Sequence, residues 1–362
     1  MGEMQRSITG SDQTRGTQSS HNTPPVSLSP SQLDAPTNLP QLYHIRSLQG
    51  KGQAMIAACN IPKGTRILCE SPTITLPGNS HDSASALLLA QLITTQLSNL
   101  PAITNKHFHT LHNNYPPPTP AAVGICKTNA LPLSHESLSA GVFLTASRIN
   151  HSCAPNAQNI WNASLGKITI HAVRDIDADS EITISYLEPF LPRPERRAKL
   201  ASAFGFDCVC KRCAVPPAQI KQSDARVERL VKLDGEISDG HRAVRDPLGC
   251  LWKIKEMLGL LEKERLGGSM VLRAYYDAFQ VVIANGKEAR AKVFAERWYA
   301  SVIVVEGEGT KDAVRAKRMV ERPAVHVLFG MGMRWKQGAG KIPRGLGEEE
   351  FGKWLWREKV GV

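Results

Sequence analysis

The sequence predicts an α+β protein, with a β-rich region in the first part of the chain and a helical region in the second. In the first part, short runs of alternating or β-branched residues lie between turns, for example Glu181–Tyr186. In the second part, apolar residues recur at helical spacing in two stripes, Leu272–Ile283 and Phe294–Ile303. At 362 residues the chain is long enough for two such regions, each with a core of its own.

The composition is that of a soluble globular protein. Apolar residues make up 42% of the chain and charged residues 21%. No stretch reaches the roughly 18 apolar residues of a membrane span, and no secretory signal is recognisable, so we expect a nuclear or cytoplasmic protein that is neither secreted nor bound to a membrane. The net charge is +11, but charges of both signs alternate in the C-terminal region, which is typical of a solvated helix surface. We therefore do not expect nucleic acid to be the main ligand.

The start of the chain predicts a disordered tail followed by short strands. Residues 1–40 are rich in Ser, Thr, Gln and Pro and cannot bury enough apolar surface to offset the entropy of ordering. Order is expected to begin near Leu42–Ile45. The turn at Gly50–Gly52 and the segments Ala54–Ala58 and Ile61–Leu68 then indicate strands separated by turns.

A helical insertion is expected to interrupt the β-rich region at residues 80–122. Its helix, from about Ser83, is indicated by apolar residues that share one face: Leu89, Leu92, Ile93, Leu97 and Leu100. Pro101 is expected to stop this helix, and Pro116–Pro118 marks an irregular link.

A strand and a short helix are expected after the middle of the chain. The alternation in Glu181–Tyr186 places three side chains on one face of a strand: Ile182, Ile184 and Tyr186. Pro194 then opens a helix that carries Phe204 near its end, and Gly205 is placed to terminate it.

The C-terminal stripes predict a helical hairpin, because Asn285–Gly286 separates them by a short turn. Residues 330–362 are rich in Gly, Lys and Trp and predict no particular element.

The cysteines indicate a metal site. Three of the eight lie in Cys208–Cys213, with the spacing C-x-C-x2-C. Without a secretory signal, clustered cysteines are better interpreted as metal ligands than as disulfides. Structural zinc takes four ligands, so a fourth must come from a distant part of the chain. The candidates are Cys153, Cys59, Cys69, Cys126 and Cys250.

The segment Arg148–Asn156, Arg-Ile-Asn-His-Ser-Cys-Ala-Pro-Asn, resembles the signature of SET-domain lysine methyltransferases. The resemblance covers pieces of residues 42–213 in order and, more loosely, the C-terminal helices. It implies a SET domain with a knot-like crossing over residues 41–190, a post-SET zinc segment over 191–213 and a tetratricopeptide-like helical domain over 214–362. The pattern is that of the SET-and-MYND group in its fungal form. The zinc-binding MYND finger of that group is absent, because the insertion has no cysteine before Cys126.

The resemblance also implies a ligand set and a lid. Cys153, inside the signature, becomes the fourth zinc ligand beside Cys208, Cys210 and Cys213. The zinc would then hold Phe204 and Phe206 over whatever the signature binds, where aromatic rings suit an adenine or an apolar channel. The alternative is that both rings are ordinary core aromatics. In related enzymes the position of Phe204 is often Tyr, so this chain lacks a hydroxyl group that those enzymes carry in the channel.

The implied cofactor is S-adenosylmethionine. In SET enzymes a glycine turn such as Gly50-Lys51-Gly52 lets the backbone approach the cofactor closely. Asn129 resembles a position that bonds the methionine part. Asn150 and His151 resemble the pair that contacts the amino-acid end and the adenine, and Phe206 is expected to cover the site. Taken alone, each Asn or His would more often be a turn former or a satisfied core residue.

The implied reaction needs alignment more than acid–base catalysis, because a methyl group moves in line from a sulfonium to an amine. The lysine amine must be neutral, although its ordinary pKa is about 10.4. An apolar channel beside a positive charge lowers that pKa. Tyr186 is the expected catalytic residue, lining this channel with Phe204.

The predicted function is therefore S-adenosylmethionine-dependent N-methylation of lysine in a protein, either a histone tail or another substrate, with structural zinc. One alternative is a non-catalytic interaction protein that keeps the SET scaffold and binds partners through its helices. Another is a zinc-containing nucleic-acid binder, whose affinity would fall steeply with salt.

Overall fold

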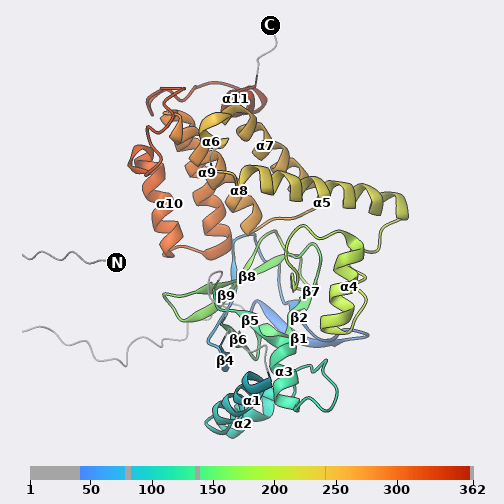
Figure 1. The fold of residues 1–362 in the computed structure, drawn as a ribbon. Helices are drawn as coiled ribbons and strands as arrows, with labels where there is room; N and C mark the ends of the chain where they lie inside the picture. Colours follow the sequence, from blue (N-terminus) through green and yellow to red (C-terminus); the bar gives the residue numbers. More distant parts are fainter. Residues whose placement is uncertain (1–40, 78–82, 135–138, 241, 359–362) are drawn as a thin grey trace, which may run out of the picture. The chain divides into compact units, whose positions relative to one another are not determined.

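The structure, a computed structural model, describes residues 41–77, 83–134, 139–240 and 242–358 (Figure 1). The predicted disordered tail, residues 1–40, lies outside the described residues. The described residues belong to one compact unit. Within its described part the α+β class is confirmed, because small sheets precede a long helical region. The domain boundaries near residues 190 and 213 stay predictions.

In the described part of the chain, the strands form four small sheets. β1 and β2 make an antiparallel hairpin, β3, β9 and β8 make one three-stranded sheet, and β4, β6 and β5 make another. β7 and β10 pair in parallel. The strands are β1 (Tyr43–Leu48), β2 (Gly52–Ala57), β3 (Arg66–Glu70), β4 (Ile74–Leu76), β5 (Leu131–Pro132), β6 (Ala140–Val142), β7 (Asn150–His151), β8 (Ala157–Asn162), β9 (Lys167–Ala172) and β10 (Thr183–Ile184).

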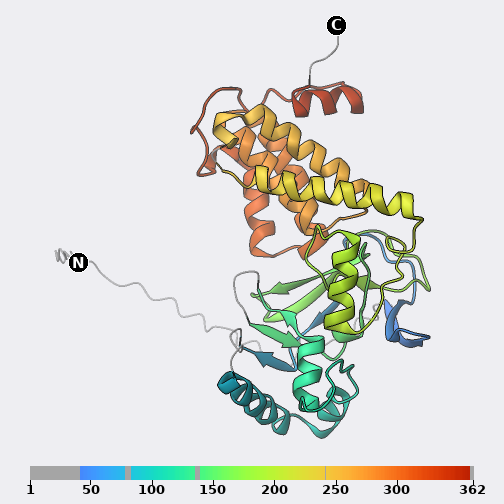
Figure 2. The ribbon, with the colours of Figure 1, turned by 45° about the vertical axis from the view of Figure 1, so that its right-hand side comes forward.

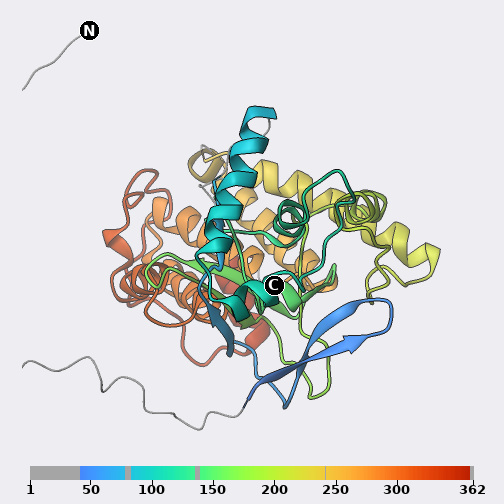
Figure 3. The same ribbon diagram turned by 90° about the horizontal axis from the view of Figure 1, so that it is seen from below.

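The hairpin β1–β2 reaches away from the other sheets, as Figure 3 shows. Its turn has positive φ at Gly50 (73°) and at Gly52 (70°), a conformation that glycine adopts without strain. A Cβ atom added at either position would meet nothing within 4 Å. The turn therefore presents bare backbone to open space.

The pairing of β7 with β10 brings the signature segment against the alternating run. Asn150 lies beside Thr183, and His151 beside Ile184. The strand is shorter than the alternation predicted, but Ile184 is buried and Tyr186 half-buried on the expected face. Thr183, expected on the opposite face, is buried as well, because Asn156 of the signature covers it and accepts its backbone N–H at 2.7 Å.

The insertion contains three helices, α1 (Ser83–Ser98), α2 (Ala102–Phe108) and α3 (Ala121–Asn129). Its helices share a core with the sheet of β4, β6 and β5, in which Leu89, Ile93 and Leu97 pack with Ile74 and Val142. The prediction for Leu92 was wrong: this side chain is 38% exposed, since residues four apart form a narrow stripe that leaves it at the edge. The first helix ends at Ser98, so Leu100 lies outside it, and Pro101 occupies the N-cap position of the second helix. The third helix extends beyond the expected limit of 122.

The helix α4 (Arg193–Phe204) and the C-terminal helices follow the sheets (Figure 2). Gly205, with φ of 73°, ends α4 as predicted. The hairpin of α8 and α9 is confirmed, with Asn285 capping α8 and with Phe279 and Trp298 in the shared core. These helices are α5 (Pro217–Ile237), α6 (Arg242–Arg245), α7 (Pro247–Lys263), α8 (Ser269–Ala284), α9 (Glu288–Glu306), α10 (Lys311–Glu321) and α11 (Glu348–Trp356).

The last helix, α11, was not predicted, and its Leu355 and Trp356 are buried in the helical core. Among the residues that the structure describes, no helix has the length and apolar character to cross a membrane.

Candidate functional site

A cavity of about 390 Å³ lies where the hairpin turn, the end of α3, the signature and the segment after α4 meet. Every residue predicted for the cofactor or the substrate channel lines it. These residues are Gly50, Lys51, Gly52, Asn129, Asn150, His151, Tyr186, Phe204 and Phe206. They come from parts of the chain that are distant in sequence, so their convergence is a property of the fold.

His151 forms the inner wall of the cavity and is almost fully buried. Its Nδ1 accepts the backbone N–H of Tyr186 at 3.0 Å, which leaves the ring proton on Nε2, 3.2 Å from the Cys153 sulfur. Burial lowers the pKa of His151 to about 4, so the ring is neutral. Since both ring nitrogens have protein partners, His151 offers the cavity its ring surface and backbone rather than a free N–H.

Asn150 is held by a carboxylate that the sequence did not single out. Its Nδ2 donates to Glu181 Oε1 at 2.9 Å, and Glu181 Oε2 pairs with Lys51 Nζ at 2.6 Å. Glu181 therefore joins the hairpin turn to the signature strand. Its place at the start of the alternating run identified a strand residue but gave no sign of this contact.

Asn129 is the last residue of α3, which sets its position. Its Nδ2 donates to the carbonyl oxygens of His112 and Ile125, at 2.7 and 2.8 Å. The amide oxygen accepts no hydrogen bond from the described part of the chain. It is the atom that Asn129 can offer to a ligand.

Tyr186 has an aromatic neighbour on each side. Its ring centroid is 4.9 Å from that of Phe204 and 5.3 Å from that of His151. The hydroxyl donates to the Ile149 carbonyl at 2.7 Å. Burial, helped by the charge of Glu181, raises the pKa of the phenol well above its ordinary value, so it stays protonated.

The turn at Gly205 brings Phe206 to the cavity directly after Phe204. A Cβ atom at Gly205 would lie 2.2 Å from the side-chain oxygen of Asn114, so this position excludes other residues. The Phe206 ring lies 6.2 Å from the His151 ring and also packs on the cysteine cluster.

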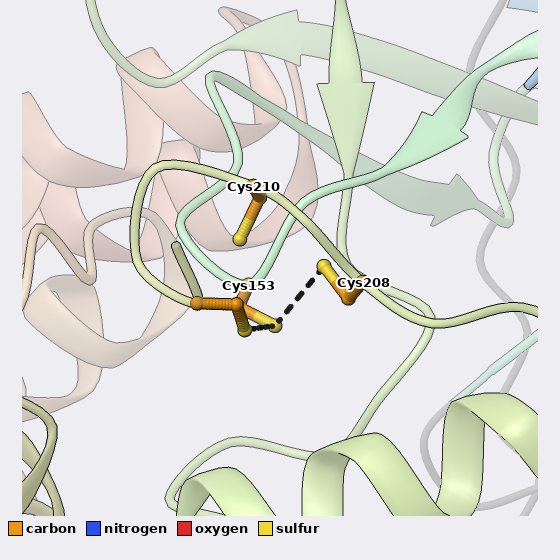
Figure 4. A group of neighbouring side chains, drawn as sticks. Cys153, Cys208 and Cys210 are labelled. Atoms are coloured by element: carbon orange, nitrogen blue, oxygen red, sulfur yellow. Dashed lines mark hydrogen bonds between the residues drawn. The ribbon is translucent and has the colours of Figure 1, made fainter. Parts of the chain in front are cut away.

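The four cysteines predicted as metal ligands lie together, with all their sulfur atoms within 4.8 Å of one another. Figure 4 labels three of them, Cys153, Cys208 and Cys210. The Cys153 sulfur is 3.9 Å from that of Cys208 and 3.5 Å from that of Cys213. Four sulfurs at about 2.3 Å from a tetrahedral zinc are about 3.8 Å apart, so the cluster fits zinc. Hydrogen bonds within the cluster lower the pKa of Cys213 and raise that of Cys153, so the thiols share protons with one another, whereas a metal would require all four as thiolates.

The rival cysteines lie elsewhere. Cys126 is in the core of the insertion and Cys250 in the helical core. Cys59 and Cys69 are half-buried in the first part of the chain, and neither joins the cluster.

A buried arginine lies beside the cysteine cluster and was not predicted from the sequence. Arg196 of α4 is only 3% exposed, and its Nη2 lies 3.9 Å from the Cys213 sulfur. Its Nη1 donates to the Leu191 carbonyl at 2.6 Å. A zinc ion with four thiolates carries two negative charges, and this guanidinium is placed to offset part of them.

Other residues that line the cavity had not been predicted to do so. Arg148, the first residue of the signature, donates to the carbonyl and hydroxyl oxygens of Thr110. These two bonds join the insertion to the cavity. The remaining lining residues are Gln53, His112, Thr128, Ser147, Gly205, Asp207, Cys208, Val209 and Cys210. His112 and Thr128 lie in the insertion and had no motif to mark them.

Comparison with known proteins agrees with this arrangement. Residues 52–187 match the SET domain family. The chain is 30% identical over 311 residues to histone-lysine N-methyltransferase set5 of Schizosaccharomyces pombe, which covers 86% of this chain and 91% of that protein. It is 30% identical over 129 residues to histone-lysine N-methyltransferase SMYD3 of Homo sapiens, 35% of this chain and 28% of the relative. It is 28% identical over 145 residues to N-lysine methyltransferase SMYD2 of Gallus gallus, 39% of this chain and 31% of the relative.

Proposed function

The chain belongs to the SET-domain family and is SET-and-MYND-like, and from that premise we propose that it is an S-adenosylmethionine-dependent protein-lysine N-methyltransferase. The observation that carries the proposal is the cavity, which gathers the glycine turn, the signature pair and the aromatic residues in one place. Relatives of this chain are named as lysine methyltransferases.

The cofactor would be held by residues from three walls of the cavity. The bare backbone of Gly50–Gly52 and the free amide oxygen of Asn129 suit the polar amino-acid end. Asn150 is oriented by Glu181, and its own amide oxygen is left to accept from an amino group. Phe206 and the His151 ring suit the flat adenine. When bound, S-adenosylmethionine supplies a methyl group on positively charged sulfur.

The channel for the lysine would run alongside Tyr186 and Phe204, whose rings are in contact and would form one wall of it. These aromatic walls strip water from the amine and thereby lower its pKa, which favours the neutral form that attacks the methyl carbon. The protonated hydroxyl of Tyr186 is fixed on the Ile149 carbonyl, so its oxygen lone pairs can orient the amine. Transfer would form the bond between the lysine nitrogen and the methyl carbon and break the bond from that carbon to sulfur, so the cofactor would leave as a neutral thioether and the methylated ammonium would release its proton to water.

The cysteine cluster would hold one structural zinc. Cys153 belongs to the signature, whereas Cys208, Cys210 and Cys213 follow Phe206. A metal bound by all four therefore ties the lid segment to the inner wall. For the substrate we propose a lysine in a histone tail or another protein, since set5 and SMYD3 are named as histone-lysine methyltransferases. The place of action would be the nucleus, the cytoplasm or both.

The test compares the wild-type protein with Tyr186→Phe, with Tyr299→Phe in the helical region as control. Cofactor affinity is measured by calorimetry, zinc by metal analysis, and methyl transfer with labelled cofactor on histones and on a cell extract. Tyr186→Phe should keep zinc and cofactor binding but lose about a hundredfold in transfer rate, because the amine is no longer oriented.

Unchanged transfer by Tyr186→Phe would remove this residue from the mechanism. If the wild-type protein does not bind S-adenosylmethionine, the proposal fails as a whole, and the non-catalytic interaction protein becomes the better interpretation. Tyr299 is half-buried and remote from the cavity, so the control should transfer methyl groups at the wild-type rate.

A further inference from the structure

We propose that Glu264, in the helical region, is a positioning residue for the cofactor cavity and acts through Arg212 and the cysteine cluster. The proposal rests on the proposed function, because it concerns the affinity of the cavity for S-adenosylmethionine. Glu264 is the residue that caps the end of α7 and does not line the cavity.

Glu264 is a buried carboxylate with a complete set of partners. Its side chain is 2% exposed. Oε2 accepts from Arg212 Nε at 2.8 Å and from the Ser223 hydroxyl at 2.5 Å, and Oε1 accepts from Arg226 Nε at 2.6 Å. Burial opposes the charge, yet the bonds from Ser223 and Arg226 and the charge of Arg212 hold the pKa of Glu264 below its ordinary value. The group is therefore ionised at neutral pH.

Arg212 connects this carboxylate to the signature. It lies between Cys210 and Cys213, and its side chain is 8% exposed. While Nε bonds Glu264, Nη1 donates to the backbone carbonyl of Cys153 at 3.2 Å. One rigid guanidinium thus touches the loop that carries three of the zinc ligands, the segment that carries the fourth, and the end of α7.

The ion pair between Arg212 and Glu264 connects the helical region to the segment that carries Phe206. Ser223 and Arg226 lie on α5, which begins a few residues after Cys213, so α5 and α7 both fix the carboxylate. The carboxylate fixes Arg212, and Arg212 fixes the spacing between the cysteine loop and the signature. Phe206 lies two residues before Cys208 and moves with that loop. We infer that the affinity of the cavity depends on an ion pair outside it.

Removing the charge of Glu264 should loosen this arrangement. A buried arginine that loses its carboxylate is left without compensation, and such sites relax by moving toward water. Arg212 would then release the Cys153 carbonyl, and the loop would hold Phe206 less firmly over the cavity. We expect the looser positioning of Phe206 to weaken cofactor binding by as much as the loss of one hydrogen bond between charged groups. The dissociation constant for the cofactor should therefore rise about tenfold.

The chain offers a matched control on the same two helices. Glu256 of α7 pairs with Arg229 of α5 through bonds of 2.6 and 2.7 Å. This pair is exposed to solvent and contacts neither Arg212 nor the cysteines. Glu256→Gln therefore removes a carboxylate from the α5–α7 contact without touching the proposed connection.

The experiment uses the full zinc-loaded chain as wild type, Glu264→Gln and Glu256→Gln. Calorimetry gives the dissociation constant for S-adenosylmethionine, and a coloured chelator gives the rate of zinc release. Glu264→Gln should weaken cofactor binding about tenfold and release zinc faster, whereas Glu256→Gln should match the wild type in both. Ser223→Ala, which removes one bond and keeps the charge, should give a smaller change in the same direction and serves if Glu264→Gln does not fold.

A double-mutant cycle of Glu264→Gln and Phe206→Ala separates an effect on the position of Phe206 from a general loss of stability. If Glu264 acts through the lid, its substitution should have little further effect on cofactor affinity once Phe206 is gone. Additive effects, or a Glu264→Gln variant that is less stable but binds cofactor as tightly as the wild type, overturn the proposal. A wild-type chain that binds no S-adenosylmethionine contradicts the proposed function instead, and the rates of zinc release then still decide whether Glu264 holds the cluster.

Discussion

Asn156 of the signature is expected to stabilise the pairing of β7 with β10 and not to bind the cofactor. Its Nδ2 donates to the Glu181 carbonyl at 2.9 Å, and its Oδ1 accepts the Thr183 backbone N–H at 2.7 Å. It does not line the cofactor cavity. Substitution Asn156→Ala removes both bonds at once.

The magnitude follows from the groups that lose their partners. The Thr183 N–H and the Glu181 carbonyl are left unpaired in a region where Thr183 is 9% exposed. Each unpaired buried group costs about 1–3 kcal/mol, so the free energy of unfolding should fall by about 2–6 kcal/mol. Asn156→Asp keeps the acceptor for Thr183 and loses only the donor to Glu181, and it also sets a carboxylate against that carbonyl oxygen.

The assay is denaturant-induced unfolding of the zinc-loaded protein, with Asn159→Ala as control. Asn159 is half-buried on the neighbouring strand β8, and its side chain makes no hydrogen bond within the described part of the chain. Its loss should change the free energy of unfolding by less than about 0.5 kcal/mol, as for other sites without special contacts. The reasoning is refuted if Asn156→Ala costs no more than Asn159→Ala.

Three further results are expected. Cys153→Ser should lose zinc and cofactor affinity together, whereas Asn150→Ala should weaken cofactor binding and keep the zinc; metal analysis with calorimetry checks both, and retention of full cofactor affinity by Cys153→Ser would contradict the link. Burial raises the pKa of Asp277 from 3.8 to about 6, so folding takes up a proton and stability should fall as the pH rises through this window. Asp277→Asn should flatten that slope in unfolding measured at several pH values, and an unchanged slope speaks against it. Phe108→Ala, in the fully buried centre of the insertion, should lower the free energy of unfolding by about 3–5 kcal/mol, and a loss below about 1 kcal/mol would show that this core does not support the fold.

The fold class and the cavity residues could be predicted because the sequence marks them locally. Alternation and helical stripes identified the strand before Tyr186 and the hairpin around Asn285, since each depends on neighbours within a few residues. The residues of the cavity came from the resemblance of Arg148–Asn156 to the SET signature. Spacing alone left several cysteines as possible fourth ligands, and it took the fold to separate Cys153 from the others.

What the sequence did not reveal depends on pairs that are distant along the chain. Arg212 and Glu264 are 52 residues apart, and neither belongs to a periodic pattern that points to the other. Glu181 likewise meets Lys51 across 130 residues. The helix α11 was missed for another reason: it has only nine residues, and its apolar residues Phe351, Trp354, Leu355 and Trp356 follow a stretch rich in Gly and Lys.

The distance along the chain between the walls of the cavity has a consequence for how the protein folds. Loop closure over 130 residues, from Lys51 to Glu181, must precede any contact that stabilises the site, and closure over 60 residues separates Cys153 from Cys213. Folds dominated by such contacts acquire their native state slowly, because chain entropy is lost before the contacts form. During synthesis the hairpin turn and the signature emerge before the segment that carries the last cysteines, so both must wait for it. The cavity can therefore close only after residue 213 has been made.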